Sequence, residues 1–178
     1  MFEFGLGMGG NTNAMNQDNF YLQDGPDFTG FSNNSYPSDP FSAYNFTTSW
    51  NKETKNPVNY NMFLRGGDSF NIGNESKLSY FLSGSFDNDF TFREGISNGS
   101  INTQGVPRRS FTFNSYNYST NTTLMGNINF KINSKHSLKF NTMLINSSSQ
   151  KHDEYTGVID IFDAATEDGG FVRRSNFD

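Results

Sequence analysis

The chain has 178 residues, of which 16% are aromatic and 17% charged, and its formal net charge is −5. It contains 20 Phe, 17 Gly and no Cys, which excludes a disulfide framework, a thiolate metal site and a cysteine nucleophile. The acidic balance argues against nucleic-acid binding, and no apolar run is long enough for a transmembrane helix. Abundant Asn, Ser, Thr, Gly and Phe favour strands and turns over helices.

Residues 1–40 are expected to form one strand followed by a long loop. Over residues 2–8, apolar side chains alternate with Glu or Gly, a short period-two pattern that predicts a sixth, weaker strand. Residues 10–40 are dense in turn-forming residues but also carry aromatic ones, among them Phe28 and Phe31. We therefore expect a loop held in place by its aromatic side chains and not a flexible linker.

Residues 41–178 are expected to contain the main strands. Within 77–93, Leu78, Tyr80 and Leu82 alternate with Lys, Ser and other mostly polar residues, and this period of two persists far beyond the roughly 3–10 residues of an ordinary strand. The same alternation occurs in five runs, which are 42–50, 58–72, 77–93, 110–132 and 137–152. The sequence thus predicts an all-β fold, an antiparallel meander of five to six long strands.

The connections between these runs alternate in length. The connections at 73–76 and 133–136 are short and polar, whereas the connection at 94–109 is long and rich in Gly, Ser and Asn. Another long segment follows residue 153, and both a short helix and an irregular strand fit 158–168. Alternating tight turns and long loops are typical of transmembrane β-barrels, so the meander is interpreted as a segment of such a barrel.

A soluble or secreted β-sandwich, such as a carbohydrate-binding or adhesin-like module, is the alternative, because one buried and one solvated face also give period two. The length of the strands favours the barrel. So do the aromatic residues near strand ends, interpreted as an interfacial girdle, and an opposite face interpreted as uniformly small and polar. These girdle residues are Phe90, Phe92, Phe111, Phe113, Tyr116 and Tyr118.

Four runs resemble early barrel strands of TonB-dependent outer-membrane receptors of Bacteroidota: 63–70 (FLRGGDSF), 78–95, 121–130 (NTTLMGNINF) and 136–141 (HSLKFN). The resemblance covers most of 41–177. It implies a barrel of about 22 strands around a plug domain that imports an unknown ligand through the outer membrane. The implied partners are outer-membrane lipid, a TonB-type energy-transducing complex and a surface lipoprotein that captures the ligand.

Five or six strands are too few to close a barrel, because single-chain barrels have about eight strands or more. An open sheet edge is also unsuited to lipid, where backbone groups must be paired. We therefore expect this chain to be the β-barrel portion, itself an incomplete fragment, of a longer outer-membrane receptor.

Candidate ligand-binding residues come from two regions. Asp87 and Asp89 share one strand face about 7 Å apart, with Arg93 farther along that face, an arrangement suited to a cation or polar ligand. Phe28 and Phe31 in the long loop offer stacking surfaces for a sugar ring, as a further hypothesis.

No catalytic, cofactor or metal site is predicted, so an enzyme is not expected. The chain has two His, and no Ser lies in a nucleophile motif. Gly5, Gly7 and Gly10 satisfy G-x-G-x-x-G, but the preceding full strand and following helix of a dinucleotide site are missing. In 152–154, the sequence His-Asp-Glu projects alternately to opposite strand faces, so these residues do not converge on a metal.

Overall fold

The computed structural model describes residues 1–23, 27–31, 52–99, 101–105, 107–159 and 171–177. They form nine elements: β1 (Phe2–Gly9), α1 (Thr12–Met15), β2 (Phe20–Gln23), β3 (Lys52–Lys55), β4 (Asn59–Ile72), β5 (Ser76–Asn98), β6 (Arg109–Lys131), β7 (Ser137–Ile159) and β8 (Phe171–Phe177). Among these residues, no helix has the length and apolar character needed to cross a membrane.

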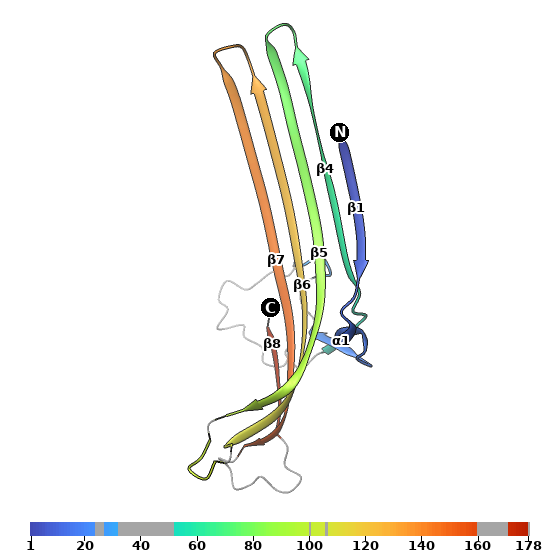
Figure 1. The fold of residues 1–178 in the computed structure, drawn as a ribbon, viewed down its shortest axis with the longest axis vertical. Coiled ribbons are helices and arrows are strands. Elements are labelled where there is room, and N and C mark those ends of the chain that lie inside the picture. Colours follow the sequence, from blue (N-terminus) through green and yellow to red (C-terminus); the bar gives the residue numbers. More distant parts are fainter. Residues whose placement is uncertain (24–26, 32–51, 100, 106, 160–170, 178) are drawn as a thin grey trace, which may run out of the picture.

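Six strands form one antiparallel sheet in the order β1-β4-β5-β6-β7-β8, and β2 and β3 pair separately. The described sheet is open, with β1 and β8 at its two edges (Figure 1). Strands β5, β6 and β7 have 23 residues each, which is far longer than ordinary strands. The prediction of an all-β antiparallel meander of five to six long strands is confirmed.

The strand boundaries agree with the alternation pattern at the tight turns and differ at the opposite end. Strands β5 and β7 continue to Asn98 and Ile159, beyond the expected ends at 93 and 152, because both keep their pairing with β6. Backbone hydrogen bonding between strands thus extends them through Gly- and Ser-containing stretches. The predicted strand at 42–50, and nearly all of 158–168, lie outside the described residues.

Strand β1 is confirmed, and its position in the sheet is a long-range property. It pairs antiparallel with β4, from Phe2 opposite Gly66 to Gly9 opposite Asn59. About fifty residues of chain separate the two strands in sequence, so no local pattern could have indicated this neighbour.

The register separates all side chains of the large sheet into two faces. Every pair in the sheet joins two even-numbered or two odd-numbered residues, as in the row Leu64, Gly84, Leu124 and Leu144. Because neighbouring residues of a strand point to opposite sides, even-numbered residues share one side and odd-numbered residues the other. These sides are called the even face and the odd face below.

The two ends of the sheet differ in their connections (Figure 1). At the tight-turn end, Gly73 adopts a φ of 68° between β4 and β5. In the turn between β6 and β7, the Asn133 side-chain oxygen accepts hydrogen bonds from the backbone N–H groups of Lys135 and His136. At the loop end, β5 and β6 are joined by residues 99–108, and the chain leaves β1 and β7.

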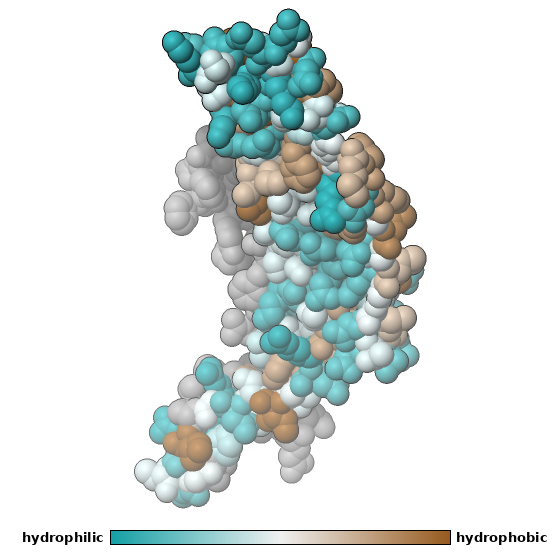
Figure 2. Space-filling model, turned by 45° about the horizontal axis from the view of Figure 1, so that its top comes forward, coloured by the Kyte–Doolittle hydropathy of each residue, from teal (hydrophilic) through white to brown (hydrophobic). Residues whose placement is uncertain are grey.

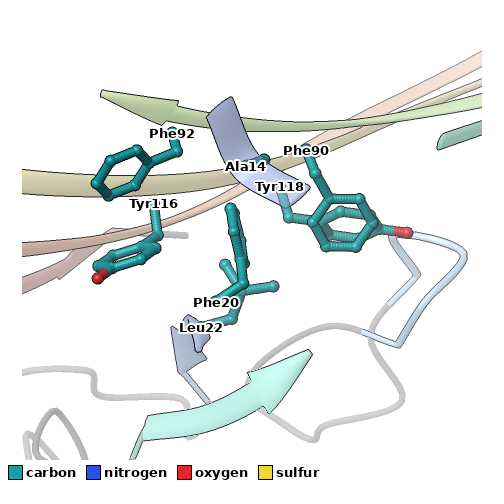
Figure 3. Packing of buried hydrophobic residues seen from close by; sticks show 7 residues of the cluster. All are labelled: Ala14, Phe20, Leu22, Phe90, Phe92, Tyr116 and Tyr118. Carbon is teal, nitrogen blue, oxygen red and sulfur yellow. The ribbon is translucent and has the colours of Figure 1, made fainter. Parts of the chain in front are cut away.

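Residues 10–23 and 27–31, here called the cover, lie on the even face at its loop end. Helix α1 lies against β5, and β2 lies against β6 and β7. Ala14, Phe20 and Leu22 of the cover are at most 2% exposed. They pack with four aromatic residues of the sheet (Figure 3) to form the hydrophobic core, which contains Phe90, Phe92, Tyr116 and Tyr118. The expected loop at 10–40 therefore includes a helical turn and a strand that are fixed by packing.

Phe20 is the centre of this core. Its ring meets those of Phe90 and Tyr116 edge to face, each with 5.3 Å between ring centroids, a favourable aromatic geometry. The four sheet residues of this core are only 4–6% exposed; they are Phe90, Phe92, Tyr116 and Tyr118. The interpretation of these four residues as an exposed interfacial girdle is wrong, because the cover buries them.

Candidate functional site

One half of the even face is apolar and bare. Leu82, Leu124 and Leu144 are 57%, 50% and 49% exposed, and no described segment lies over them. We name this surface the apolar band; its residues are Phe2, Phe4, Leu6, Met62, Leu64, Phe70, Leu78, Tyr80, Leu82, Leu124, Ile128, Phe130, Leu138, Phe140 and Leu144. Exposed apolar surface of this extent indicates an interaction with another molecule or with lipid.

The band has a defined height along the strands. On β4 it extends from Met62 to Phe70, whereas Phe86, opposite Met62, is 9% exposed and contacts Phe28 of the cover. Eight residue steps correspond to about 26 Å of strand, or roughly 20 Å of height at the tilt of about 35–45° that barrel strands have, close to the apolar belt of about 25 Å around outer-membrane barrels. Figure 2 shows hydrophilic residues at the tight-turn end and apolar residues gathered directly below them along one side.

Asp68 is the only charged residue of the described strands within the band. It is opposite Tyr80, close to the tight-turn end, and its carboxylate accepts a hydrogen bond from the backbone N–H of Ser69 at 2.7 Å. At the edge of a bilayer an acidic side chain costs little, about 0–1 kcal/mol. The position of Asp68 is therefore compatible with the rest of the band.

The odd face is mainly polar, with hydrogen bonds that run across the strands. Ser147 donates to Asn121 at 3.0 Å, and Ser149 donates to Asn117 at 2.9 Å. The expectation of a uniformly small and polar face is wrong in one place, where a group of apolar side chains is exposed. This group comprises Phe63, Phe81, Met125, Met143 and Ile145, and the Met125–Met143 pair is directly cross-strand.

The structure separates the three predicted ligand-binding residues of β5. Asp89 accepts a hydrogen bond from the Asn59 side chain at 2.5 Å, where β4 begins to pair with β5, so its position has a structural explanation. Asp87 is exposed on the odd face. Of these three residues, Arg93 is the one that lines a hollow, which lies farther toward the loop end.

The hollow that contains Arg93 has a volume of about 270 Å³ on the odd face of β5, β6 and β7. Its charged side chains are Arg93, Lys151 and Asp153, and its aromatic ones are Phe113 and Tyr155. The Lys151 ammonium contacts Asp153 Oδ2 at 2.8 Å. Three strands thus bring together charges that are up to 60 positions apart in sequence, from Arg93 to Asp153.

The two predicted aromatic residues of the cover have different environments. Phe28 has ring contacts with Tyr60, Phe86 and Tyr118, at centroid distances of 5.4, 6.0 and 6.2 Å, so it anchors the cover to the sheet. Phe31 is 43% exposed. Of these two residues, Phe31 is therefore the one with exposed surface that a ligand could contact.

Tyr118 fixes the cover by a polar contact as well. Its hydroxyl donates a hydrogen bond to the backbone carbonyl of Phe28. Burial raises the pKa of Tyr118 to about 12, so the hydroxyl keeps its proton and remains a donor throughout the neutral range.

Replacement of Tyr118 by phenylalanine is expected to loosen residues 27–31. The lost hydrogen bond corresponds to about 0.5–1.5 kcal/mol, so amide hydrogen exchange in this turn should become faster while the rest of the cover changes little. Tyr80→Phe is the matched control, because Tyr80 is exposed on the band. Equal exchange in both variants would contradict a role for this hydroxyl.

The histidine of the predicted 152–154 set is part of the buried even face. His152 is 1% exposed and contacts the Glu154 carboxylate at 3.2 Å, whereas Asp153 lies on the odd face with Lys151. The expected projection to opposite faces is confirmed by these contacts. Within the described ranges, no group of three or more His, Asp or Glu side chains is placed to hold a metal ion.

No family model, curated protein or solved structure matches the chain. The surfaces described above are therefore the basis for a functional assignment. Sequence reasoning identified Arg93 but missed Lys151, Asp153, Phe113 and Tyr155 as its neighbours. The only sequence signal was that all five are odd-numbered, which places them on one face once the register is known.

Proposed function

We propose that this chain forms part of the wall of an outer-membrane β-barrel, within a TonB-dependent type of receptor that imports an unknown ligand. The observation that carries the proposal is the apolar band, which is exposed, is confined to one half of one face, and on β4 extends from Met62 to Phe70, about the length with which a tilted β-strand crosses a membrane. In this arrangement the even face contacts lipid and the odd face lines the interior.

Two further features support the proposal. The tight turns lie at the end next to the band, whereas the long connections lie at the other end, the distribution typical of periplasmic turns and extracellular loops. The cover begins where the band stops, so it shields even-face aromatic residues that would lie outside the lipid. The open edges at β1 and β8 would pair with further strands, since lipid cannot satisfy their backbone groups.

Single-cysteine labelling tests the proposed orientation. Because the chain has no Cys of its own, each introduced cysteine is the only thiol that can react. In lipid vesicles, Leu82→Cys is expected to resist a charged, water-soluble maleimide and to react after transfer to denaturant. Ser83→Cys, its odd-face neighbour, and Glu75→Cys, in an exposed tight turn, should be modified in vesicles.

The labelled protein should also be located in cells. An antibody to residues 99–108 is expected to detect it in the outer-membrane fraction. A soluble protein in which Leu82→Cys and Glu75→Cys react equally fast would contradict the barrel and favour a soluble β-sheet binding module.

A further inference from the structure

A guanidinium group and a carboxylate with one unpartnered oxygen face the hollow on the odd face. Arg93 is exposed and has no hydrogen bond or ion pair with any other described residue. Asp153 is 2% exposed, and its Oδ1 atom is buried without a hydrogen-bond partner among the described residues. One cationic group and one carboxylate oxygen without a donor, both within the described part of the chain, therefore lie on a single wall.

The register fixes how far apart these two groups are. Arg93, Ser115 and Asp153 occupy one row across β5, β6 and β7. Directly opposite Cβ atoms are about 5 Å apart, so the row places Arg93 and Asp153 about 10 Å apart at their Cβ atoms. The long Arg93 side chain shortens the distance between the charged groups, and a small molecule can contact both.

The state of Asp153 favours a ligand that carries a donor. A buried acceptor without a donor destabilises the fold, and an ion pair with a partly exposed lysine contributes little stability in return. Lys151 binds the other carboxylate oxygen, and its side chain is 42% exposed. The ammonium of a ligand can supply the donor that Oδ1 lacks while Lys151 stays on Oδ2.

An apolar wall completes the hollow one row nearer the loop end. Phe113 and Tyr155 are directly opposite each other, with 6.0 Å between ring centroids and 33° between ring planes. The volume of about 270 Å³ is just below the range of about 300–1,000 Å³ for pockets that hold drug-sized ligands. A single small molecule fits these dimensions better than a polymer.

We propose that the hollow binds a small zwitterion with an apolar group, such as a free α-amino acid. Arg93 pairs with the ligand carboxylate through its planar guanidinium group, Asp153 pairs with the ligand ammonium, and Phe113 and Tyr155 contact the apolar side chain. The inference rests on the proposed function in one respect, because it identifies this zwitterion as the class of molecule that the receptor imports.

Calorimetric titration of the full-length purified protein with L-phenylalanine tests the proposal. L-Phenylalaninamide lacks the carboxylate and N-acetyl-L-phenylalanine lacks the ammonium, so each is expected to bind at least about tenfold more weakly, since hydrogen bonds to charged groups contribute about 1.5–3 kcal/mol. Arg93→Gln should abolish the preference for phenylalanine over its amide. Asp153→Asn should abolish the preference over the N-acetyl derivative.

Lys77→Gln serves as the matched control, because it removes an exposed odd-face charge on the same strand outside the hollow and should leave all affinities unchanged. Arg93 is exposed, so Arg93→Gln decides the question even if Asp153→Asn fails to fold.

Absence of phenylalanine binding, equal affinity for the three compounds, or tighter binding of glucose would each overturn the proposed ligand class. The cysteine-labelling pattern separates this failure from failure of the barrel. Loss of phenylalanine binding with protected Leu82→Cys refutes the ligand site alone, whereas reactive Leu82→Cys refutes the membrane orientation.

Discussion

Replacement of Phe20 by alanine is expected to release the cover from the sheet. Phe20 is 1% exposed and touches Phe90 and Tyr116, and truncation of a buried Phe to Ala typically costs about 3–5 kcal/mol. The cover is tied to the sheet by few other buried side chains, so the loss should act locally and raise the population of an open cover.

Amide hydrogen exchange measures this opening directly. Because about 1.4 kcal/mol corresponds to a factor of ten, exchange of the amides in 12–23 should accelerate by roughly 100-fold or more. Phe31→Ala is the control, since that side chain is 43% exposed and its truncation should change exchange in 12–23 by much less. Unchanged exchange in Phe20→Ala would show that the cover does not depend on this core.

Introduction of arginine into the apolar band is expected to have the second largest effect. Leu124 is 50% exposed within the band, and an arginine facing lipid costs up to about 2–4 kcal/mol, the value at the bilayer midplane. Leu124→Arg should therefore lower the denaturant midpoint of the protein in lipid vesicles and reduce its assembly into the outer membrane.

The neighbouring residue provides the matched control. Thr123→Arg introduces the same side chain one residue away on the odd face, which the proposal places toward the interior and away from lipid, and should cost clearly less than Leu124→Arg. If the protein is soluble, Leu124→Arg would leave stability and yield unchanged, because the band would then face water. Equal effects of the two variants would contradict the assignment of the faces.

Much of the large sheet could be predicted from local patterns. Alternation over 58–72, 77–93, 110–132 and 137–152 located β4 to β7, because a strand with unlike faces requires period two. The short polar stretches at 73–76 and 133–136 also marked both tight turns correctly, since Gly73 supplies a positive φ and Asn133 closes its turn by side-chain hydrogen bonds.

The candidate site was only partly accessible from sequence. Arg93 was identified because it lies on the same strand face as Asp87 and Asp89. Its partner Asp153 could not be, because their proximity depends on two cross-strand registers, β5 with β6 and β6 with β7. Within a single strand, Asp153 shows no property that distinguishes it from a solvated acidic residue.

Side-chain alternation and turn chemistry were enough to predict the fold class, the two-faced strands and the difference between the two ends of the sheet. Which apolar residues are exposed and which are buried became clear from the packing of the folded chain. Leu82 and Phe90 have the same parity on the same strand, yet Leu82 is 57% exposed and Phe90 is 4% exposed. The difference comes from the cover, whose contacts join residues more than sixty positions apart, and a periodic pattern contains no information about such long-range packing.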